Sequence, residues 1–331
     1  MNASTAKINP KRVTLATLRR MAATGDPFAC LTCYDATTAR WLARAGVHVL
    51  LVGDTAAEVV LGLSRTIDMP LEVLLALTAG VKRGAPESLV MGDMPFMSYQ
   101  ADEPEAIRNA GRFLREGLAD VVKFEADESF APLIAKVVRA GIPVCGHVGS
   151  RPQRAALTSG YASAGRSPAD AERIVRDAVA MERAGCSLLL VEAVPEAVAS
   201  EIMRVTTVPL IGIGAGAGCH GQVVVLQDVM GLNLTTPPFV RPVASMGEAL
   251  ERAARSWVDQ VARRDVPPSP YTGIPADDGS APHMRPDDAV GRRAVQVDHG
   301  DPERRPGRVN TQPRSVEQAG NKPLAPPGAR G

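Results

Sequence analysis

The stretch that decides the fold runs from Asp120 to Gly149 and reads DVVKFEADESFAPLIAKVVRAGIPVCGHVG. It begins and ends with mostly apolar runs, which are typical of buried parallel strands. Between the two runs, Pro132–Ala140 carries apolar residues at helical spacing and stops before Gly141, a residue type common just after a helix. A strand, a helix and a second strand in this order predict a strand–helix–strand unit of a parallel sheet.

The same alternation continues on both sides of this stretch. The pattern predicts eight strands, at Phe28–Asp35, Val47–Asp54, Ser88–Pro95, Asp120–Ala126, Ile142–Gly149, Cys186–Val194, Val208–Gly216 and Val223–Gly231. The predicted helices are an extra N-terminal one at Val13–Ala23, then Leu71–Arg83, Glu105–Glu116, Pro132–Ala140, Pro168–Ala184, and Met246–Arg263, which would close the domain. This repetition favours an α/β fold, a single closed (β/α)8 TIM barrel, over a doubly wound open sheet.

The barrel does not account for the whole chain of 331 residues. Of its 27 prolines, 12 lie between Asp265 and Gly331, a stretch with one isoleucine, one leucine and no phenylalanine or tryptophan. Such a segment buries too little apolar surface to offset the entropy of folding. We therefore expect a flexible N-terminus at 1–12, the barrel at 13–266 and a proline-rich disordered tail at 267–331.

Composition excludes several classes of function. A net charge of +1 and 4% aromatic residues argue against binding to nucleic acid. No apolar run approaches the roughly 20 residues that span a bilayer, so we expect no membrane association. Five cysteines at irregular spacing indicate reduced thiols, and we expect a cytoplasmic protein.

Polar side chains gather where the predicted strands end. They are Tyr34-Asp35, Gly53-Asp54, Asp93, Lys123 with Glu125, His147 and Glu192, on the first six strands in order. In a barrel these carboxyl ends converge on one mouth, where active sites lie. Helix capping explains Asp35 or Asp54 taken alone, but it does not explain the lysine, the histidine and the glutamates as well.

The carboxylates in this cluster favour a metal site. Asp54 and Asp93 would approach each other from neighbouring strands, and a bound cation would relieve their repulsion. Oxygen ligands from one or two carboxylates, completed by water and substrate, suit Mg²⁺. Glu125 would add a third oxygen, directly or through water.

The other members of the cluster suggest acid–base chemistry on an acidic substrate. Lys123 shares a strand face with Glu125 and would bind a substrate carboxylate, although an internal salt bridge with a carboxylate is the simpler alternative. Glu192 lies among apolar neighbours that would raise its pKa, which makes it a candidate general base. His147 is either a hydrogen-bond donor at the mouth or a buried structural histidine.

Two further motifs carry no function in our interpretation. Gly216–Gly221 has the spelling G-x-G-x-x-G, but it follows the seventh strand, and no acidic residue lies near Arg241 to bind a ribose. Cys30 and Cys33 are three apart on a predicted strand, so their side chains face opposite ways and are core residues.

Together these residues give the chain a resemblance to the ketopantoate hydroxymethyltransferase family. The matching stretches, in family order, are Leu31–Asp35, Leu51–Asp54, Val81–Pro86, Asp93–Met97, Val122–Glu125, Pro143–His147, Gly160-Tyr161, Leu190–Glu192 and Ile211–Gly216. The resemblance implies a (β/α)8 barrel, a homo-oligomer (a decamer in the family) and Mg²⁺ as cofactor. The reaction it implies transfers a hydroxymethyl group from 5,10-methylenetetrahydrofolate to 3-methyl-2-oxobutanoate, giving 2-dehydropantoate for pantothenate biosynthesis.

The resemblance also implies roles for individual residues. Asp54 and Asp93 would hold the metal with support from Glu125. The 2-oxo acid would contact the two metal ligands together with Thr55, Lys123 and His147. Glu192 would remove the C3 proton to give a metal-stabilised enolate, which would attack the one-carbon unit.

Some loops depart from the family pattern. Thr55 replaces a serine, Ser150-Arg151 interrupts a Gly-Leu-Thr-Pro-Gln run, and Gly62–Pro70 differs from its family counterpart. Three alternatives therefore stay open: a diverged relative acting on another 2-oxo acid, a Mg²⁺-dependent C–C lyase of the phosphoenolpyruvate mutase/isocitrate lyase type, and a non-catalytic scaffold. The lyase alternative would need a catalytic cysteine on a loop, for which Cys219 is the nearest candidate.

Overall fold

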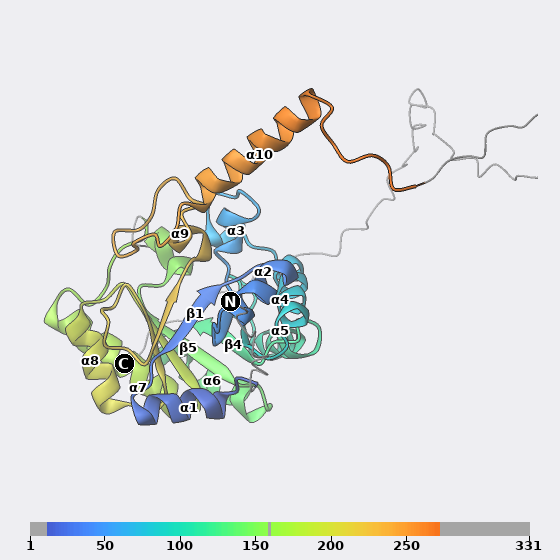
Figure 1. The fold of residues 1–331 in the computed structure, drawn as a ribbon. Coiled ribbons are helices and arrows are strands. Elements are labelled where there is room, and N and C mark those ends of the chain that lie inside the picture. Colours follow the sequence, from blue (N-terminus) through green and yellow to red (C-terminus); the bar gives the residue numbers. More distant parts are fainter. Residues whose placement is uncertain (1–11, 158–159, 272–331) are drawn as a thin grey trace, which may run out of the picture. The chain divides into compact units, whose positions relative to one another are not determined.

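The computed structural model describes residues 12–157 and 160–271. Within them eight parallel strands close into a barrel in chain order (Figure 1). The strands are β1 (Phe28–Thr32), β2 (Val49–Val52), β3 (Leu89–Asp93), β4 (Val121–Glu125), β5 (Val144–Gly149), β6 (Leu188–Glu192), β7 (Leu210–Ile213) and β8 (Gly221–Val224). The (β/α)8 barrel is thus confirmed, and the open doubly wound sheet is wrong because β8 pairs with β1.

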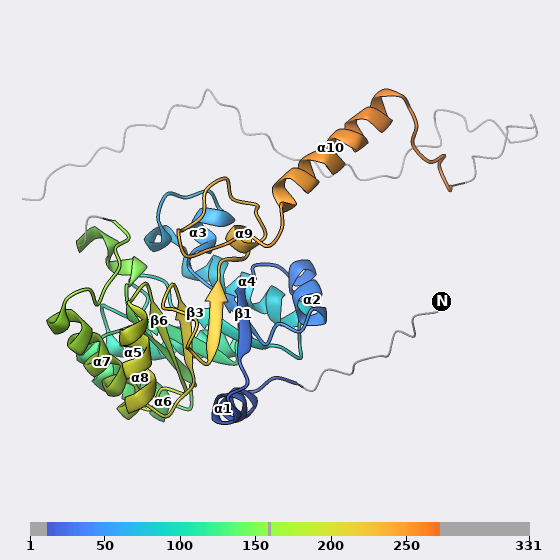
Figure 2. The same cartoon turned by 60° about the vertical axis from the view of Figure 1, so that its left-hand side comes forward.

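Helices follow most strands and surround the barrel (Figures 1 and 2). The α-helices are α1 (Leu15–Thr24), α2 (Ala36–Arg44), α3 (Ala56–Val59), α4 (Leu71–Gly84), α5 (Glu103–Arg115), α6 (Ala131–Arg139), α7 (Pro168–Arg183), α8 (Glu196–Val205), α9 (Leu226–Val229) and α10 (Met246–Ala262). Short 3-10 helices are η1 (Thr66–Asp68), η2 (Glu128–Phe130) and η3 (Pro152–Leu157).

The last predicted strand has the wrong bounds. We expected it at Val223–Gly231, but β8 ends at Val224 and α9 begins at Leu226. The apolar run crosses the strand–helix boundary, and an apolar run alone does not distinguish a buried strand from a buried helix. The helices α2 and α8 were not among those predicted. Asp35 begins α2 as its N-cap, accepting hydrogen bonds from the amides of Thr37 and Thr38, so capping is its role.

The barrel interior is filled at one end and polar at the other. Alternate residues of the strands point inward, and those nearest the strand starts form an apolar cluster that includes Phe28, Val49, Val121 and Leu188. The helix α1 lies at this end in both views, and its buried Leu18 packs into the same cluster (Figures 1 and 2). The chain therefore seals the barrel at the strand starts, and the site must open at the carboxyl ends.

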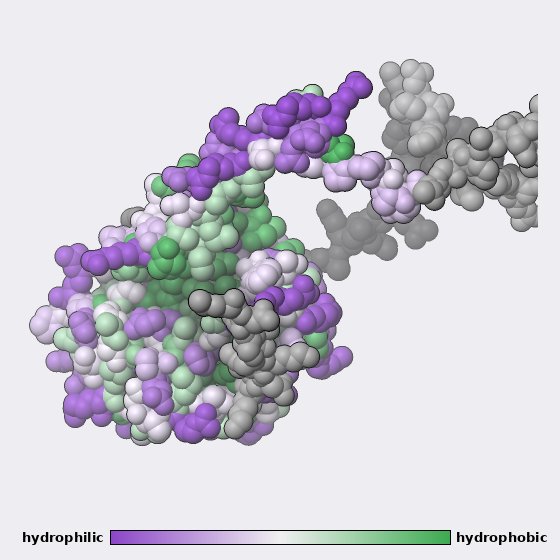
Figure 3. Space-filling model, in the orientation of Figure 1, coloured by the Kyte–Doolittle hydropathy of each residue, from purple (hydrophilic) through white to green (hydrophobic). Residues whose placement is uncertain are grey.

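The final helix does not close the domain as we expected. None of the residues of α10 is buried in the described chain. Apolar side chains are exposed over its first turns and the segment before it, including Phe239, Val243, Met246 and Leu250. Figure 3 shows a hydrophobic area on the face of the barrel unit below the helix. The amphipathic pattern predicted a helix at the right place, but not what its apolar face contacts.

The chain divides into two units, Met1–Val266 and Pro267–Gly331. Our expectations of a flexible segment at 1–12 and a disordered tail at 267–331 fall almost entirely outside the described residues. Among the described residues, no helix combines the length and apolarity needed to cross a bilayer.

Candidate active site

The predicted site residues come together because of strand register. Along β4, Val121 faces the apolar interior, so Lys123 and Glu125 face the same way, one and two steps closer to the mouth. Asp93 of β3 is level with Lys123, and His147 of β5 is level with Glu125. Neighbouring strands thus deliver an alternating set of acidic and basic groups to the carboxyl end of the barrel.

An ion pair lies at the centre of the cluster. Lys123 Nζ is 2.8 Å from Asp93 Oδ1, and both side chains are almost fully buried. The salt bridge that we considered as the simpler role of Lys123 therefore exists. Asp54 follows β2, and its backbone N–H donates to Asp93 Oδ2 at 3.2 Å, which brings the two aspartates to adjacent positions.

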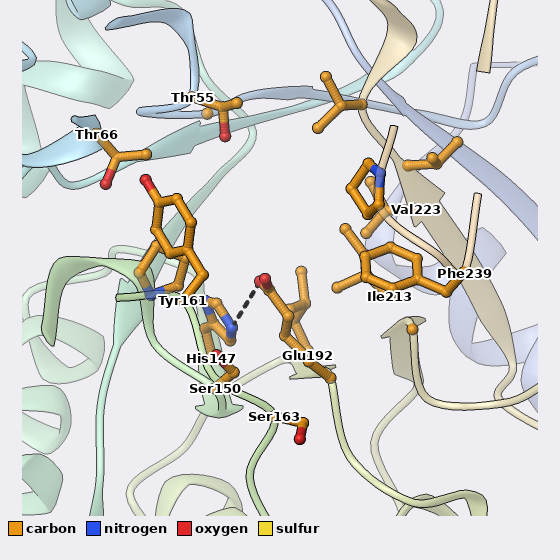
Figure 4. A pocket seen from close by; sticks show the side chains of 18 of the residues that line it. Thr55, Thr66, His147, Ser150, Tyr161, Ser163, Glu192, Ile213, Val223 and Phe239 are labelled. Carbon is orange, nitrogen blue, oxygen red and sulfur yellow. Dashed lines mark ion pairs between the residues drawn. The ribbon is translucent and has the colours of Figure 1, made fainter. Parts of the chain in front are cut away.

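His147 connects this pair to Glu192. Its Nδ1 lies 3.3 Å from Lys123 Nζ, and its Nε2 lies 3.4 Å from Glu192 Oε2, the contact dashed in Figure 4. Burial and the nearby positive charge of Lys123 hold the pKa of His147 well below its usual range, so the ring is neutral. Since Nδ1 faces an ammonium donor, it must accept, and the ring proton therefore lies on Nε2, toward Glu192.

Burial raises the pKa of every carboxyl group in the cluster. It raises the pKa of Asp54 to about 7, with a further contribution from the charge of Asp93, and it also raises the pKa of Asp93 and Glu125. The pKa of Glu192 rises to about 7, mainly through burial and partly offset by Lys123. Burial opposes the charge on Lys123, but the surrounding carboxylates outweigh it and raise its pKa. Four acids thus surround one lysine.

The backbone around Glu192 is tightly constrained. Gly149 of β5 has φ 91°, and a Cβ there would lie 2.7 Å from the carbonyl oxygen of Glu192, so only glycine fits. On the other side, Ala193 has φ 49°, a left-handed conformation that costs a non-glycine residue about 1 kcal/mol or more. Such strain next to a carboxylate of raised pKa is typical of functional sites.

The cluster forms one wall of a cavity of about 710 Å³. The residues to which we assigned a metal, substrate or catalytic role line it: Asp54, Thr55, Asp93, Lys123, Glu125, His147 and Glu192. Tyr34 and Asp35, which also lie at a strand end, are not among the lining residues. An apolar wall faces the acids and contains Ile213, Val223 and Phe239 (Figure 4). Glu192 extends between the two walls, so its carboxylate is within reach of a ligand that contacts both.

Some residues of the site were not predicted. Phe239 lies on the segment after α9, so in the sequence it does not follow a strand directly. Gln153 lies on η3 and donates hydrogen bonds to Asp54 and Glu125. Neither position follows from hydrophobic periodicity. The Pro152-Gln153 pair did lie in a run shared with the family, and that was the one signal pointing to Gln153.

The donor set fits a divalent cation of the magnesium type. Glu125 Oε1 is buried without a hydrogen-bond partner in the described chain, and Asp54 and Asp93 are adjacent, almost fully buried carboxylates. Across residues 12–157 and 160–271, no three side chains of His, Cys, Asp or Glu are placed to ligate one ion directly. Mg²⁺ commonly uses only one or two carboxylates and fills its other positions with oxygen from water or substrate. Asp54 and Asp93 suit that pattern, and Glu125 would add to it through water.

The loop after β5, which differs from the family pattern, is held by a second group of charged side chains. Arg151, with 9% of its side chain exposed, lies 2.7 Å from Asp127, and Arg154 lies 2.9 Å from the same oxygen. Burial alone would raise the pKa of Asp127, but hydrogen bonds from Ser129 and Arg151 outweigh it and lower the pKa to about 2. Arg151, which departs from the family run, thus has a local partner in Asp127.

We expect Asp127→Asn to destabilise the barrel by about 2 kcal/mol at pH 7, because Arg151 would stay buried without its counter-charge. A lowered folded-state pKa contributes stability that is present above the unfolded value near 4 and is lost as pH falls toward 2. The gap between variant and wild type should therefore shrink below about pH 4. Urea unfolding at several pH values measures it, with Asp259→Asn on exposed α10 as control. An equal gap at pH 7 and pH 3 would contradict this account.

Comparison with known proteins gives the site its context. A family model described as ketopantoate hydroxymethyltransferase matches residues 12–269. A 3-methyl-2-oxobutanoate hydroxymethyltransferase of Carboxydothermus hydrogenoformans is 41% identical over 257 residues, covering 77% of this chain and 93% of the relative. One of Rhodococcus jostii is 43% identical over 260 residues, covering 78% and 90%.

Solved structures share the barrel at much lower identity. A 2,3-dimethylmalate lyase of the PEP mutase/isocitrate lyase superfamily has a TM-score of 0.51 and 19% identity, covering 80% of this chain and 93% of its own. A phosphonopyruvate hydrolase solved with oxalate and Mg²⁺ has a TM-score of 0.52 and 13% identity, covering 82% and 92%. At such identity the likeness establishes the fold alone. The family model and the close relatives go further, and with the assembled acidic cluster they establish that this chain belongs to the ketopantoate hydroxymethyltransferase family.

Proposed function

We propose that the chain transfers a hydroxymethyl group from 5,10-methylenetetrahydrofolate to 3-methyl-2-oxobutanoate in a Mg²⁺-dependent reaction that gives 2-dehydropantoate. One observation carries this proposal: Glu192, a carboxylate whose pKa is raised to about 7, shares a cavity with the paired Asp54 and Asp93. A base opposite a cation site is the arrangement that abstraction of a proton next to a carbonyl requires. The substrate is the one after which the close relatives, 3-methyl-2-oxobutanoate hydroxymethyltransferases, are named.

Each polar group at the mouth has a part in binding the 2-oxo acid. Asp54 and Asp93 would hold a divalent cation, which would supply Lewis-acid stabilisation of the negative charge that develops on the substrate. Lys123 provides a positive charge for the substrate carboxylate while it stays paired with Asp93. The hydroxyl of Thr55, at the start of α3, lines the same part of the cavity and donates to a second substrate oxygen.

Glu192 performs the proton transfer. The C3–H bond of the substrate breaks, the proton passes to the Glu192 carboxylate, and the electron pair remains as the enolate. The neutral His147 directs its Nε2 toward the same carboxylate and orients it. C3 then forms a bond to the methylene carbon of the folate, and the two bonds from that carbon to folate nitrogens break. Water supplies the new hydroxyl group and one proton, Glu192 returns the other proton, and tetrahydrofolate leaves.

The cavity offers room for both ligands. Its volume of about 710 Å³ is in the range of pockets that hold drug-sized molecules, well beyond the needs of a five-carbon acid. Ile213 and Val223 face the acids and suit the branched alkyl group, and Phe239 presents an aromatic face to a larger ring (Figure 4).

The lyase alternative lacks its nucleophile in this cavity. Cys219 is 5% exposed and packs against Gly212, and it is absent from the described residues that line the cavity. Burial raises the pKa of its thiol to about 11, which suppresses the reactive thiolate. A thiol in that position fits a core residue.

A product assay tests the proposal. The full chain is incubated with 3-methyl-2-oxobutanoate, 5,10-methylenetetrahydrofolate and Mg²⁺, and 2-dehydropantoate is measured by mass spectrometry. Parallel reactions contain 2-oxobutanoate or 2-oxopentanoate as the acceptor. Product from the branched acid supports the proposal. Product from a straight-chain acid alone would contradict it and show that the chain acts on another 2-oxo acid.

The pH dependence of proton abstraction follows from Glu192. Only its deprotonated form accepts a proton, so the rate at saturating Mg²⁺ should fall about tenfold per pH unit below the pKa of Glu192. That pKa is about 7, and a cation beside Asp93 lowers the midpoint because the charge of Asp93 contributes to the shift. Deuterium uptake between pH 5 and 9 measures the profile. A rate that is flat, or that rises as pH falls, would rule out Glu192 as the base.

A further inference from the structure

Gln153 donates hydrogen bonds to two carboxylates of the acidic cluster, those of Asp54 and Glu125. It lies on η3, after β5, and only 5% of it is exposed. Its side-chain N–H groups donate to Asp54 Oδ2 at 3.0 Å and to the carbonyl oxygen of Met94 at 2.8 Å. Its backbone N–H donates to Glu125 Oε2 at 3.1 Å. One residue therefore contacts two of the three carboxylates assigned to the cation.

The surroundings allow only one orientation of the Gln153 amide. The side-chain nitrogen faces two acceptors, the Asp54 carboxylate and the Met94 carbonyl. A rotated amide would turn its oxygen toward both of them, which is repulsive. The side-chain oxygen faces Gln100 Nε2 at 3.1 Å, which donates to it. It also faces the Tyr99 hydroxyl at 2.9 Å, whose one proton can go either to this oxygen or to the Glu125 carbonyl oxygen, also 2.9 Å away. Tyr99 is itself fixed by edge contacts with Phe124 and Phe130.

We propose that Gln153 is a positioning residue that holds the carboxylates of Asp54 and Glu125 in the orientation in which they bind a divalent cation. This inference rests on the proposed metal-dependent function. Gln153 occupies one oxygen of each carboxylate, and the other oxygen of Glu125 remains without a hydrogen-bond partner in the described chain. Because Gln153 is uncharged, it orients these groups without competing with the cation for their charge.

A residue that hydrogen-bonds to metal-binding carboxylates contributes measurably to the affinity for the metal. Replacing a residue that orients metal ligands commonly costs about 10- to 100-fold in affinity. Gln153→Met keeps the length of the side chain but removes its donors and acceptor, so Asp54 would lose its fixed rotamer. The dissociation constant for Mg²⁺ should rise by about 10- to 100-fold, while kcat at saturating Mg²⁺ stays within about threefold.

The experiment measures cation binding directly on the full chain, without substrate. Titration calorimetry with Mg²⁺ and electron paramagnetic resonance with Mn²⁺ give affinity and ligand geometry independently of turnover. The matched control is Gln222→Met, because Gln222 is exposed and bonds only the Gly216 carbonyl. The control should bind both cations as the wild type does.

A second variant tests the same idea with little risk to folding. Tyr99→Phe removes the hydroxyl facing the Gln153 oxygen and keeps the ring packing. Loss of one hydrogen bond should weaken Mg²⁺ binding by about two- to tenfold. If Gln153→Met fails to fold, as judged by its melting temperature, Tyr99→Phe decides the question.

The outcomes separate this inference from the proposed function. The positioning role is supported if the wild type binds Mg²⁺ and Mn²⁺, both variants bind them more weakly, and the Gln222→Met control binds them as the wild type does. Variants that bind within about twofold of the wild type overturn the inference and leave the proposed function intact. A wild-type chain that binds neither cation overturns both.

Discussion

Replacing Glu192 by glutamine is expected to abolish deuterium exchange at C3 of 3-methyl-2-oxobutanoate, with a loss of at least about 10²- to 10⁴-fold. Glutamine has the same shape as glutamate, and its amide oxygen would keep the position of Glu192 Oε2, 3.4 Å from His147 Nε2, so the site should stay assembled. What disappears is the group that takes the proton. Exchange in D₂O, followed by loss of the C3 proton signal in NMR, measures the step without any folate.

The control for this variant is Glu201→Gln on α8. Glu201 is exposed and pairs only with Arg204, so its replacement should leave exchange unchanged. Mg²⁺ binding to Glu192→Gln should also be close to wild type, since Glu192 does not belong to the proposed ligand set. Exchange within about threefold of wild type in Glu192→Gln would show that another group is the base.

The second large effect is expected for Asp93→Asn. This change removes the negative charge that pairs with Lys123 and one of the two proposed cation ligands. Lewis-acid stabilisation contributes several kcal/mol to such steps, so we expect a loss of about 10³-fold in exchange at physiological Mg²⁺. Exchange measured against Mg²⁺ concentration should show a half-saturation point moved strongly upward, with part of the rate restored at high Mg²⁺.

Asp102→Asn is the matched control for this second variant. Asp102 is exposed at the start of α5 and makes no capping hydrogen bond through its side chain, so its loss should be neutral. If Asp93→Asn kept both the wild-type rate and the wild-type Mg²⁺ dependence, Asp93 would be a structural partner of Lys123 and nothing more.

The sequence predicted the barrel because each strand and most helices obey one local rule. Buried parallel strands are short apolar runs, and Val121, Lys123 and Glu125 of β4 show how the same alternation that fills the interior also directs side chains to the mouth. The convergence of Asp93, His147 and Glu192 follows from parallel strand order alone. Asp54, Asp93, Lys123, Glu125, His147 and Glu192 therefore line one cavity, whereas Asp35, also at a strand end, caps α2.

Other features depended on contacts that periodicity does not encode. The boundary between β8 and α9 falls within one apolar run, so no change of pattern marks it. The pairing of Arg151 with Asp127 and the bonds of Gln153 join loops to distant strand ends. Phe239 reaches the cavity from an irregular segment. Such contacts are set by tertiary packing, and only the structure reveals them.

The account's central claim is that this chain removes the C3 proton of a branched 2-oxo acid with the help of a divalent cation. The most direct measurement is deuterium exchange at C3 of 3-methyl-2-oxobutanoate by the wild-type chain, with Mg²⁺ and without folate. We predict exchange that requires both protein and Mg²⁺ and that stops when EDTA is added. Absence of exchange under these conditions, or exchange unaffected by EDTA, would contradict the account.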